Sequence, residues 1–135
     1  MAVNTLDHVN IRSSRIAESV VFYRDLLGMT VGPVPGQTDT SENAWVMSDD
    51  GRPVVHLNAA SDGTDFLGNG ENWTGVTGSA RVHHVAFDCG GYDELRDRLA
   101  GAGLPLQFNE VESIGLRQIF ARDPNGVLIE LNFRQ

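Results

Sequence analysis

Four side chains that bind divalent metals recur at matching places along this chain of 135 residues. His84 follows His8 by 76 residues, and Glu130 follows His56 by 74. Imidazoles and a carboxylate that leave open coordination positions suit Fe(II), Mn(II), Ni(II) or Zn(II). Such a metal acts as a Lewis acid on the oxygens of a bound substrate. This chemistry requires that the elements of the chain bring the four side chains together.

Glu130 lies in the middle of a predicted strand that follows a strong turn signal. Asp123-Pro-Asn-Gly126 predicts a turn, because Asn-Gly suits the positive φ of a two-residue hairpin. The next residues alternate, so one strand face is apolar and the other carries Leu128, Glu130 and Asn132. The plain interpretation of Glu130 is an exposed strand residue. The histidines elsewhere in the chain favour a functional role.

The chain contains the same predicted order of elements twice. An alternating strand over 5–12 or 82–88 is followed by a helical pattern that ends at Gly28 or Gly103. Three strands follow in each half, over 29–34, 44–48 and 53–58, and over 104–112, 116–122 and 127–133. Each half is therefore βαβββ, which indicates a duplicated unit. The prediction is one α+β domain over 1–135, with module one at about 4–60 and module two at about 81–135.

Residues 61–80 connect the two predicted modules and are rich in Gly, Ser, Thr, Asn and Asp. A loop of this length in a compact domain is usually functional or a linker. Phe66 and Trp73 lie within it. They are candidates to wall a substrate cup, and the alternative is that they only anchor the loop.

Strand alternation predicts which side chains share a sheet face. The apolar residues of the first and last strands of each half face the helices. The opposite face then carries all four candidate ligands, His8, His56, His84 and Glu130. His83 precedes His84 and is expected to face the helix side or solvent as a structural residue.

Composition excludes several classes of partner. The net charge of −8 disfavours nucleic acid and anionic membranes, both of which require a basic face. Cys89 is the single cysteine, so no intrachain disulfide can form, as is usual in a reducing compartment. No apolar run is long enough to span a membrane, and the N-terminus has no signal-peptide pattern. We expect a cytoplasmic protein.

The chain resembles the vicinal oxygen chelate superfamily, which includes glyoxalase I, type I extradiol dioxygenases, fosfomycin-resistance thioltransferases and bleomycin-resistance proteins. The resemblance spans essentially the whole chain and rests on Leu6-Asp-His-Val-Asn-Ile11, Phe22-Tyr-Arg-Asp-Leu-Leu-Gly-Met29, His83-His-Val-Ala-Phe87 and Asp123-Pro-Asn-Gly-Val-Leu-Ile-Glu130. It implies two βαβββ modules in a cupped mixed sheet, with the helices outside and one divalent metal bound. By position it implies His8, His84 and Glu130 as ligands.

His56 departs from the pattern of this superfamily. The resemblance puts it where glyoxalase I enzymes have a fourth ligand, commonly Glu or Gln. Either His56 completes a site of three histidines and one glutamate, or a one-residue slip near Pro53 leaves a three-ligand triad. A metal-bound carboxylate is the proton-transfer base in glyoxalase I, so the resemblance implies Glu130 in that role. Glu130 and His56 are the catalytic candidates.

The resemblance implies a metal-dependent enzyme that binds a small substrate through vicinal oxygens. A lyase or isomerase of the glyoxalase type is favoured. The alternatives are an Fe(II) extradiol catechol dioxygenase and a metal-free binding protein like the drug-sequestering members. Family members of this length often pair modules between chains, so a homodimer is implied. The candidates for contact with the substrate are Asn10, Phe66, Trp73 and, for an anionic group, Arg117.

Overall fold

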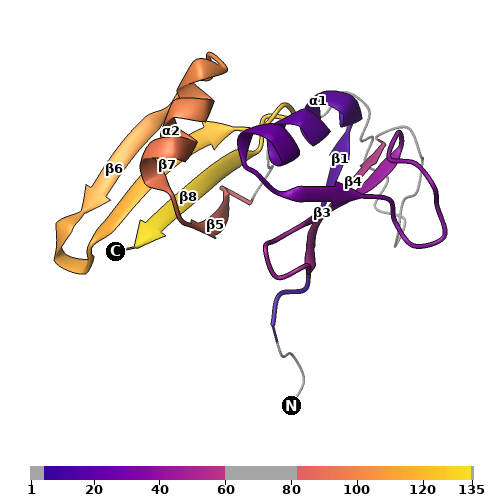
Figure 1. The fold of residues 1–135 in the computed structure, drawn as a ribbon, viewed down its shortest axis with the longest axis horizontal. Helices are drawn as coiled ribbons and strands as arrows, with labels where there is room; N and C mark the ends of the chain where they lie inside the picture. Colours follow the sequence, from indigo (N-terminus) through magenta and orange to yellow (C-terminus); the bar gives the residue numbers. More distant parts are fainter. Residues whose placement is uncertain (1–4, 60–81, 135) are drawn as a thin grey trace. The chain divides into compact units, whose positions relative to one another are not determined.

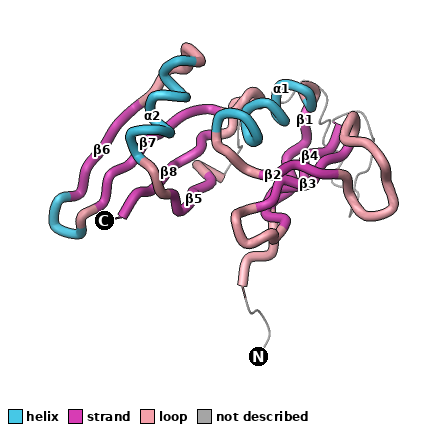
Figure 2. Tube along the Cα trace, viewed as in Figure 1, coloured by secondary structure: helices cyan, strands magenta, loops and turns pink. Residues whose placement is uncertain are grey.

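The structure, a computed structural model, describes residues 5–59 and 82–134, which belong to two compact units (Figures 1 and 2). The first unit contains β1 (Val9–Ser13), α1 (Ile16–Val21), the π-helical turn η1 (Phe22–Leu26), β2 (Thr30–Gly32), β3 (Asn43–Met47) and β4 (Pro53–Ala59). The second contains β5 (Val85–Cys89), α2 (Tyr92–Gly101), β6 (Gln107–Val111), the 3-10 turn η4 (Glu112–Ile114), β7 (Leu116–Arg122) and β8 (Leu128–Arg134).

The two units have the same topology. Within the described residues each unit has a four-stranded sheet, in the order β1-β4-β3-β2 or β5-β8-β7-β6. The first and last strands of each unit pair in parallel, and the remaining pairs are antiparallel. The predicted α+β fold with two βαβββ modules is therefore confirmed.

The core of the first unit lies between its helical segment and one sheet face. Val55 and Leu57 of β4 are almost completely buried, as are Ala44 and Val46 of β3. Tyr23 in η1 is fully buried. The helix begins at Ile16, and just before it the Ser13 hydroxyl accepts a hydrogen bond from the Arg15 amide at 2.8 Å. The other sheet face of this unit is its helix-free face.

The core of the second unit is built in the same way. Leu95 and Leu99 of α2 pack over a sheet face that includes the buried Ile119, Ile129 and Leu131. The Tyr92 ring meets the Phe133 ring edge-on, with centroids 5.1 Å apart, so α2 lies on the Phe133 side of β8. Glu130 is an odd number of residues from Phe133 and therefore lies on the helix-free face of this sheet.

The turn before β8 forms as predicted. The buried Asp123 carboxylate accepts hydrogen bonds from the backbone amides of Asn125 at 2.8 Å and Val127 at 2.9 Å. Gly126 has φ 82°, a left-handed conformation that strongly favours glycine. Asp123 thus closes the turn and sets where β8 begins.

The first strands begin later than the alternation predicted. β1 starts at Val9 and β5 at Val85, where pairing with β4 and β8 begins. His8 and His84 therefore lie immediately before these strands in both units. His83 is exposed, which agrees with the solvent alternative predicted for it, but its Nδ1 lies only 3.0 Å from His84 Nδ1. Strict alternation applies only inside a strand, and both histidines precede one.

The helices within residues 5–59 and 82–134 are too short and too polar to span a membrane.

Candidate functional site

His56 is held by amide groups from both neighbouring strands. Asn10 of β1 and Trp45 of β3 are its register partners, and all three lie on the helix-free face of the first unit. Asn10 Nδ2 donates to His56 Nδ1 at 3.1 Å, and His56 Nε2 donates to Asn43 Oδ1 at 3.0 Å. Both ring nitrogens are therefore engaged, in the tautomer that carries its proton on Nε2.

His8 lies beside this cluster with a different pattern of contacts. Its Nδ1 donates to Asp7 Oδ2 at 2.6 Å, and its ring meets Trp45 edge-on at 4.9 Å between centroids. The His8 and His56 rings are 6.4 Å apart between centroids. Within the described part of the chain, no side chain hydrogen-bonds to His8 Nε2. This nitrogen is therefore open to a ligand.

His84 and Glu130 come together in the second unit. His84 Nε2 lies 3.7 Å from Glu130 Oε1, beyond hydrogen-bonding distance. His84 Nδ1 is hydrogen-bonded to His83 Nδ1, so the other ring nitrogen of His84, Nε2, is the one that faces the carboxylate. Two atoms that each lie about 2.0–2.2 Å from one metal ion are roughly 3 Å apart. A small approach of the two side chains would give that spacing.

The second oxygen of Glu130 is already occupied. Asn132 Nδ2 donates to Oε2 at 2.9 Å. Gln118 Nε2 in turn donates to Asn132 Oδ1 at 2.9 Å, and Asn109 Nδ2 to Gln118 Oε1 at 2.7 Å. Glu130 therefore keeps one oxygen directed to His84 and the other held by an amide. Its side chain is only 15% exposed.

Arg117 is not brought to this group. It pairs with Phe133 in register and lies on the helix side of the sheet, one residue out of phase with Gln118. Its guanidinium stacks over the Tyr92 ring, 4.0 Å from the centroid, and its buried Nε has no hydrogen-bond partner among the described residues. The predicted substrate contacts Phe66 and Trp73 lie outside the described residues.

The four candidate ligands are divided between the units, two in each. Across residues 5–59 and 82–134, no group of three His, Cys, Asp or Glu side chains could hold a metal ion. The first unit contains His8 and His56, and the second contains His84 and Glu130. The donor set that the sequence predicted is chemically suitable, but neither described unit has the complete set by itself.

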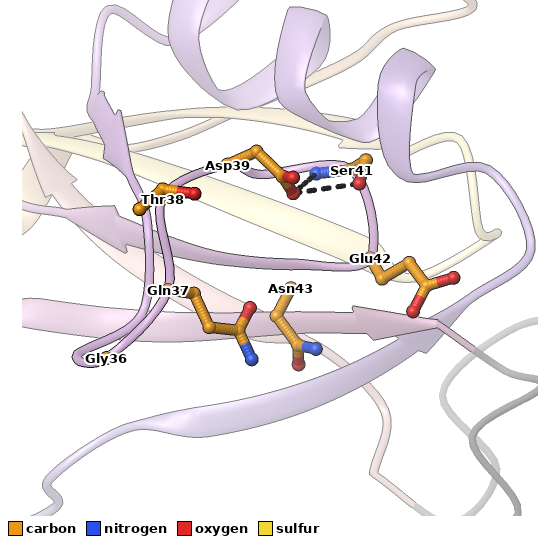
Figure 3. A pocket seen from close by; sticks show the side chains of 7 residues that line it. All are labelled: Gly36, Gln37, Thr38, Asp39, Ser41, Glu42 and Asn43. Carbon is orange, nitrogen blue, oxygen red and sulfur yellow. Dashed lines mark hydrogen bonds between the residues drawn. The ribbon is translucent and has the colours of Figure 1, made fainter.

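A polar hollow of about 500 Å³ lies beside the His56 cluster, in the loop before β3 (Figure 3). The Asp39 carboxylate accepts the backbone amide and the hydroxyl of Ser41, at 3.1 and 2.8 Å. Asn43 lines the hollow, and its side-chain oxygen also accepts the hydrogen bond from His56 Nε2. The hollow is lined by Gly36, Gln37, Thr38, Asp39, Ser41, Glu42 and Asn43.

Several residues of these clusters were not among the candidate site residues from the sequence, although Asn132 was placed on the same strand face as Glu130. Trp45 and Asn43 contact the histidines of the first unit, and Gln118 and Asn132 lead to Glu130 in the second. The alternation of β3 and β7 would have placed Trp45 and Gln118 on the same face as the ligands. Strand register, which decides their contacts, is not visible in the pattern of one strand.

The sequence of this chain also matches the model of a known protein family. The model of the Glyoxalase/Bleomycin resistance protein/Dioxygenase superfamily matches residues 5–131. The chain belongs to this superfamily. Its members include lyases, dioxygenases and resistance enzymes, so membership alone does not identify the reaction. No curated protein matches the chain in sequence.

Solved structures of superfamily members share the fold. A glyoxalase/dioxygenase from Nostoc punctiforme is 20% identical, with a TM-score of 0.74 over 99% of this chain and 93% of its own. A lactoylglutathione lyase from Agrobacterium tumefaciens is 16% identical, with a TM-score of 0.66 over 98% and 96%. A fosfomycin resistance protein from Listeria monocytogenes is 13% identical, with a TM-score of 0.68 over 98% and 95%. At these identities the likeness establishes the fold alone.

Proposed function

We propose that this protein is a metal-dependent enzyme that binds a small substrate through vicinal oxygens, with His8, His84 and Glu130 as the metal ligands. The observation that carries the proposal is the pairing in the second unit. His84 Nε2 and Glu130 Oε1 lie 3.7 Å apart, while the other nitrogen and the other oxygen are each engaged by a neighbour. The two free donor atoms are thus directed toward the same space.

His8 resembles His84 in that its Nδ1 is engaged by a neighbouring side chain, which leaves Nε2 for a metal. A histidine ligand usually donates its second ring N–H to a carboxylate or another acceptor, which fixes the ring and its tautomer. His8 does this through Asp7 Oδ2, and its Nε2 remains available. Two imidazole nitrogens and one carboxylate oxygen suit Fe(II), Mn(II), Ni(II) or Zn(II).

His56 is better suited to a place beside the metal than on it. Both of its nitrogens hydrogen-bond to amides, so ligation would break the contact with Asn10 or with Asn43. We therefore assign His56 to the group that surrounds the site, with Asn10 holding its ring in place. Of the two possibilities for the site, three ligands or four, this geometry supports three.

We propose glyoxalase-type lyase or isomerase chemistry. The bound metal supplies a Lewis acid for the adjacent oxygens of the substrate. Glu130 supplies the carboxylate that takes a proton from the substrate and returns it. A homodimer is part of the proposal, since short chains that resemble this superfamily often pair their modules between chains.

Metal binding by untagged protein tests this proposal. We expect about one divalent ion per chain, and we expect His8→Ala, His84→Ala and Glu130→Ala each to weaken binding by more than about 100-fold, beyond the usual loss from an outer-shell change. His56→Ala should retain most of the affinity. Arg134→Gln is the matched control, because Arg134 lies on the same strand and, among residues 5–59 and 82–134, its side chain pairs only with the exposed Asp88.

The identity of the metal and the substrate tests the reaction. With a Zn, Ni or Mn site, we expect turnover of thiol adducts of α-ketoaldehydes. Iron together with ring cleavage of catechols would replace the lyase with a dioxygenase. Wild-type protein that takes up no ion from any of these metals would overturn the metal-dependent function.

A further inference from the structure

Three neutral amides form a continuous hydrogen-bonded line that ends on Glu130. The line runs from Asn109 on β6 through Gln118 on β7 to Asn132 on β8 and from there to Glu130, with successive distances of 2.7, 2.9 and 2.9 Å. We call these three residues the amide line. Its last donor, Asn132 Nδ2, contacts Glu130 Oε2.

The register of the sheet builds the amide line. Asn109 is paired with Gln118, and Gln118 with Asn132. Glu130 is two residues from Asn132 along β8, so all four side chains lie on the helix-free face. Side chains that are paired in register on one face of a sheet lie close enough to contact each other across the strands. The line is therefore a consequence of strand pairing rather than of one local motif.

Every amide in the line points its N–H groups the same way. Asn109 donates to Gln118, and Gln118 and Asn132 each accept with the side-chain oxygen from the previous member and donate with the nitrogen to the next group. The final acceptor is a carboxylate, and hydrogen bonds to a charged group are stronger than those between neutral groups. The line therefore holds Glu130 Oε2 and leaves Oε1 directed to His84.

The first unit uses amides at the equivalent strand positions. Asn43 pairs with Asn58 in register, as Gln118 pairs with Asn132. Asn43 holds His56 Nε2 at 3.0 Å, and His56 occupies the strand position that Glu130 has in the second unit. The third-strand amide contacts the candidate site residue directly in the first unit, whereas in the second unit Gln118 reaches Glu130 through Asn132.

We propose that Asn132 and Gln118 are positioning residues that select which oxygen of Glu130 binds the metal. This inference rests on the proposed metal site. Asn132 acts by direct contact and Gln118 acts by fixing the Asn132 amide. Asn109 is exposed and ends the line, so its contribution is the smallest.

The test is Co²⁺ binding, measured by calorimetry and by the visible spectrum of the bound ion. We expect Asn132→Leu and Gln118→Met to weaken binding by about 10- to 100-fold, as is typical for outer-shell partners. Asn109→Ala should have a smaller effect, and Arg134→Gln none. Thermal unfolding of each metal-free variant shows whether loss of affinity merely follows loss of stability. If Asn132→Leu does not fold, Gln118→Met and Asn109→Ala decide.

A second readout needs no metal. In the metal-free protein, Glu130→Gln should shift the side-chain amide NMR signals of Asn132 most, those of Gln118 less and those of Asn109 least. Two results would overturn the positioning role of the amide line while leaving the metal site intact. One is wild-type Co²⁺ affinity in both Asn132→Leu and Gln118→Met, and the other is unchanged amide signals in Glu130→Gln. Wild-type protein that binds no Co²⁺ would instead overturn the proposed function, and with it the role of Asn132 and Gln118 in selecting the oxygen of Glu130 that binds the metal.

Discussion

The roles of the histidines depend on which ring nitrogen remains available. His8 and His84 each have Nδ1 engaged by a neighbour, whereas His56 has both nitrogens engaged. Imidazole is a ligand only through a nitrogen that carries a free lone pair. Three residues of the same type therefore divide into two candidate ligands and one supporting residue. The sequence analysis gave His8 and His84 as ligands and left open whether His56 is a fourth.

Cys89 shows the effect of burial on a single titratable group. Burial raises the pKa of its thiol to about 11, and the nearby Asp88 adds to this. Only the thiolate reacts, so at pH 8 we expect alkylation by iodoacetamide to be about 100-fold slower than for a thiol with the ordinary pKa near 9. Intact mass after timed quenching measures the rate, and urea-unfolded protein is the control. A rate that stops rising below pH 9 would contradict this prediction.

At the scale of elements, each helix stabilises the sheet face opposite the candidate site. The apolar residues of α2 pack on the side of β8 that carries Ile129 and Leu131, which leaves Glu130 on the other side. The strand is therefore fixed in register by burial of one face. That register is what aligns the polar side chains on the helix-free face.

Leu99 tests this anchoring by α2. Its side chain is completely buried, so Leu99→Ala should lower the free energy of unfolding by about 2–5 kcal/mol through lost burial and a residual cavity. Urea denaturation measures the change. Arg98→Ala is the control on the same helix, because it removes only an exposed ion pair with Glu94, of about 0.3–0.5 kcal/mol. Equal effects of the two substitutions would show that α2 does not anchor the sheet.

At the scale of the whole molecule, the proposed site needs both units. His8 belongs to the first unit, and His84 and Glu130 to the second. The two units share one topology and one strand register, as expected for a duplicated module. A single module of this kind would therefore not suffice for the proposed metal site.

Mixing of variants tests the proposed homodimer. If each site takes one unit from each chain, His8→Ala and Glu130→Ala proteins that are unfolded together and refolded should regain about a quarter of the wild-type metal content, since half of the dimers are mixed and each mixed dimer has one intact site. Each variant refolded alone is the control. Restoration would be absent if every site were built within one chain. A monomer by sedimentation equilibrium would exclude the dimer.

The sequence by itself determined the order of elements and the sheet face of His56 and Glu130, which lie inside strands. Periods of two and of about 3.6 residues are local properties of strands and helices, so the βαβββ pattern, the turn at Asp123 and the face of Glu130 followed from short segments. The exact beginnings of β1 and β5 did not follow, because a strand begins where a partner strand is available.

Only the tertiary structure decided which polar side chains meet. Gln118 contacts Asn132 across 14 residues of chain, and Asn10 contacts His56 across 46. Such contacts depend on the register between strands that are distant in sequence, and burial of the apolar face sets that register for the strand as a whole. The available nitrogen of each histidine and the held oxygen of Glu130 are therefore tertiary properties of this protein.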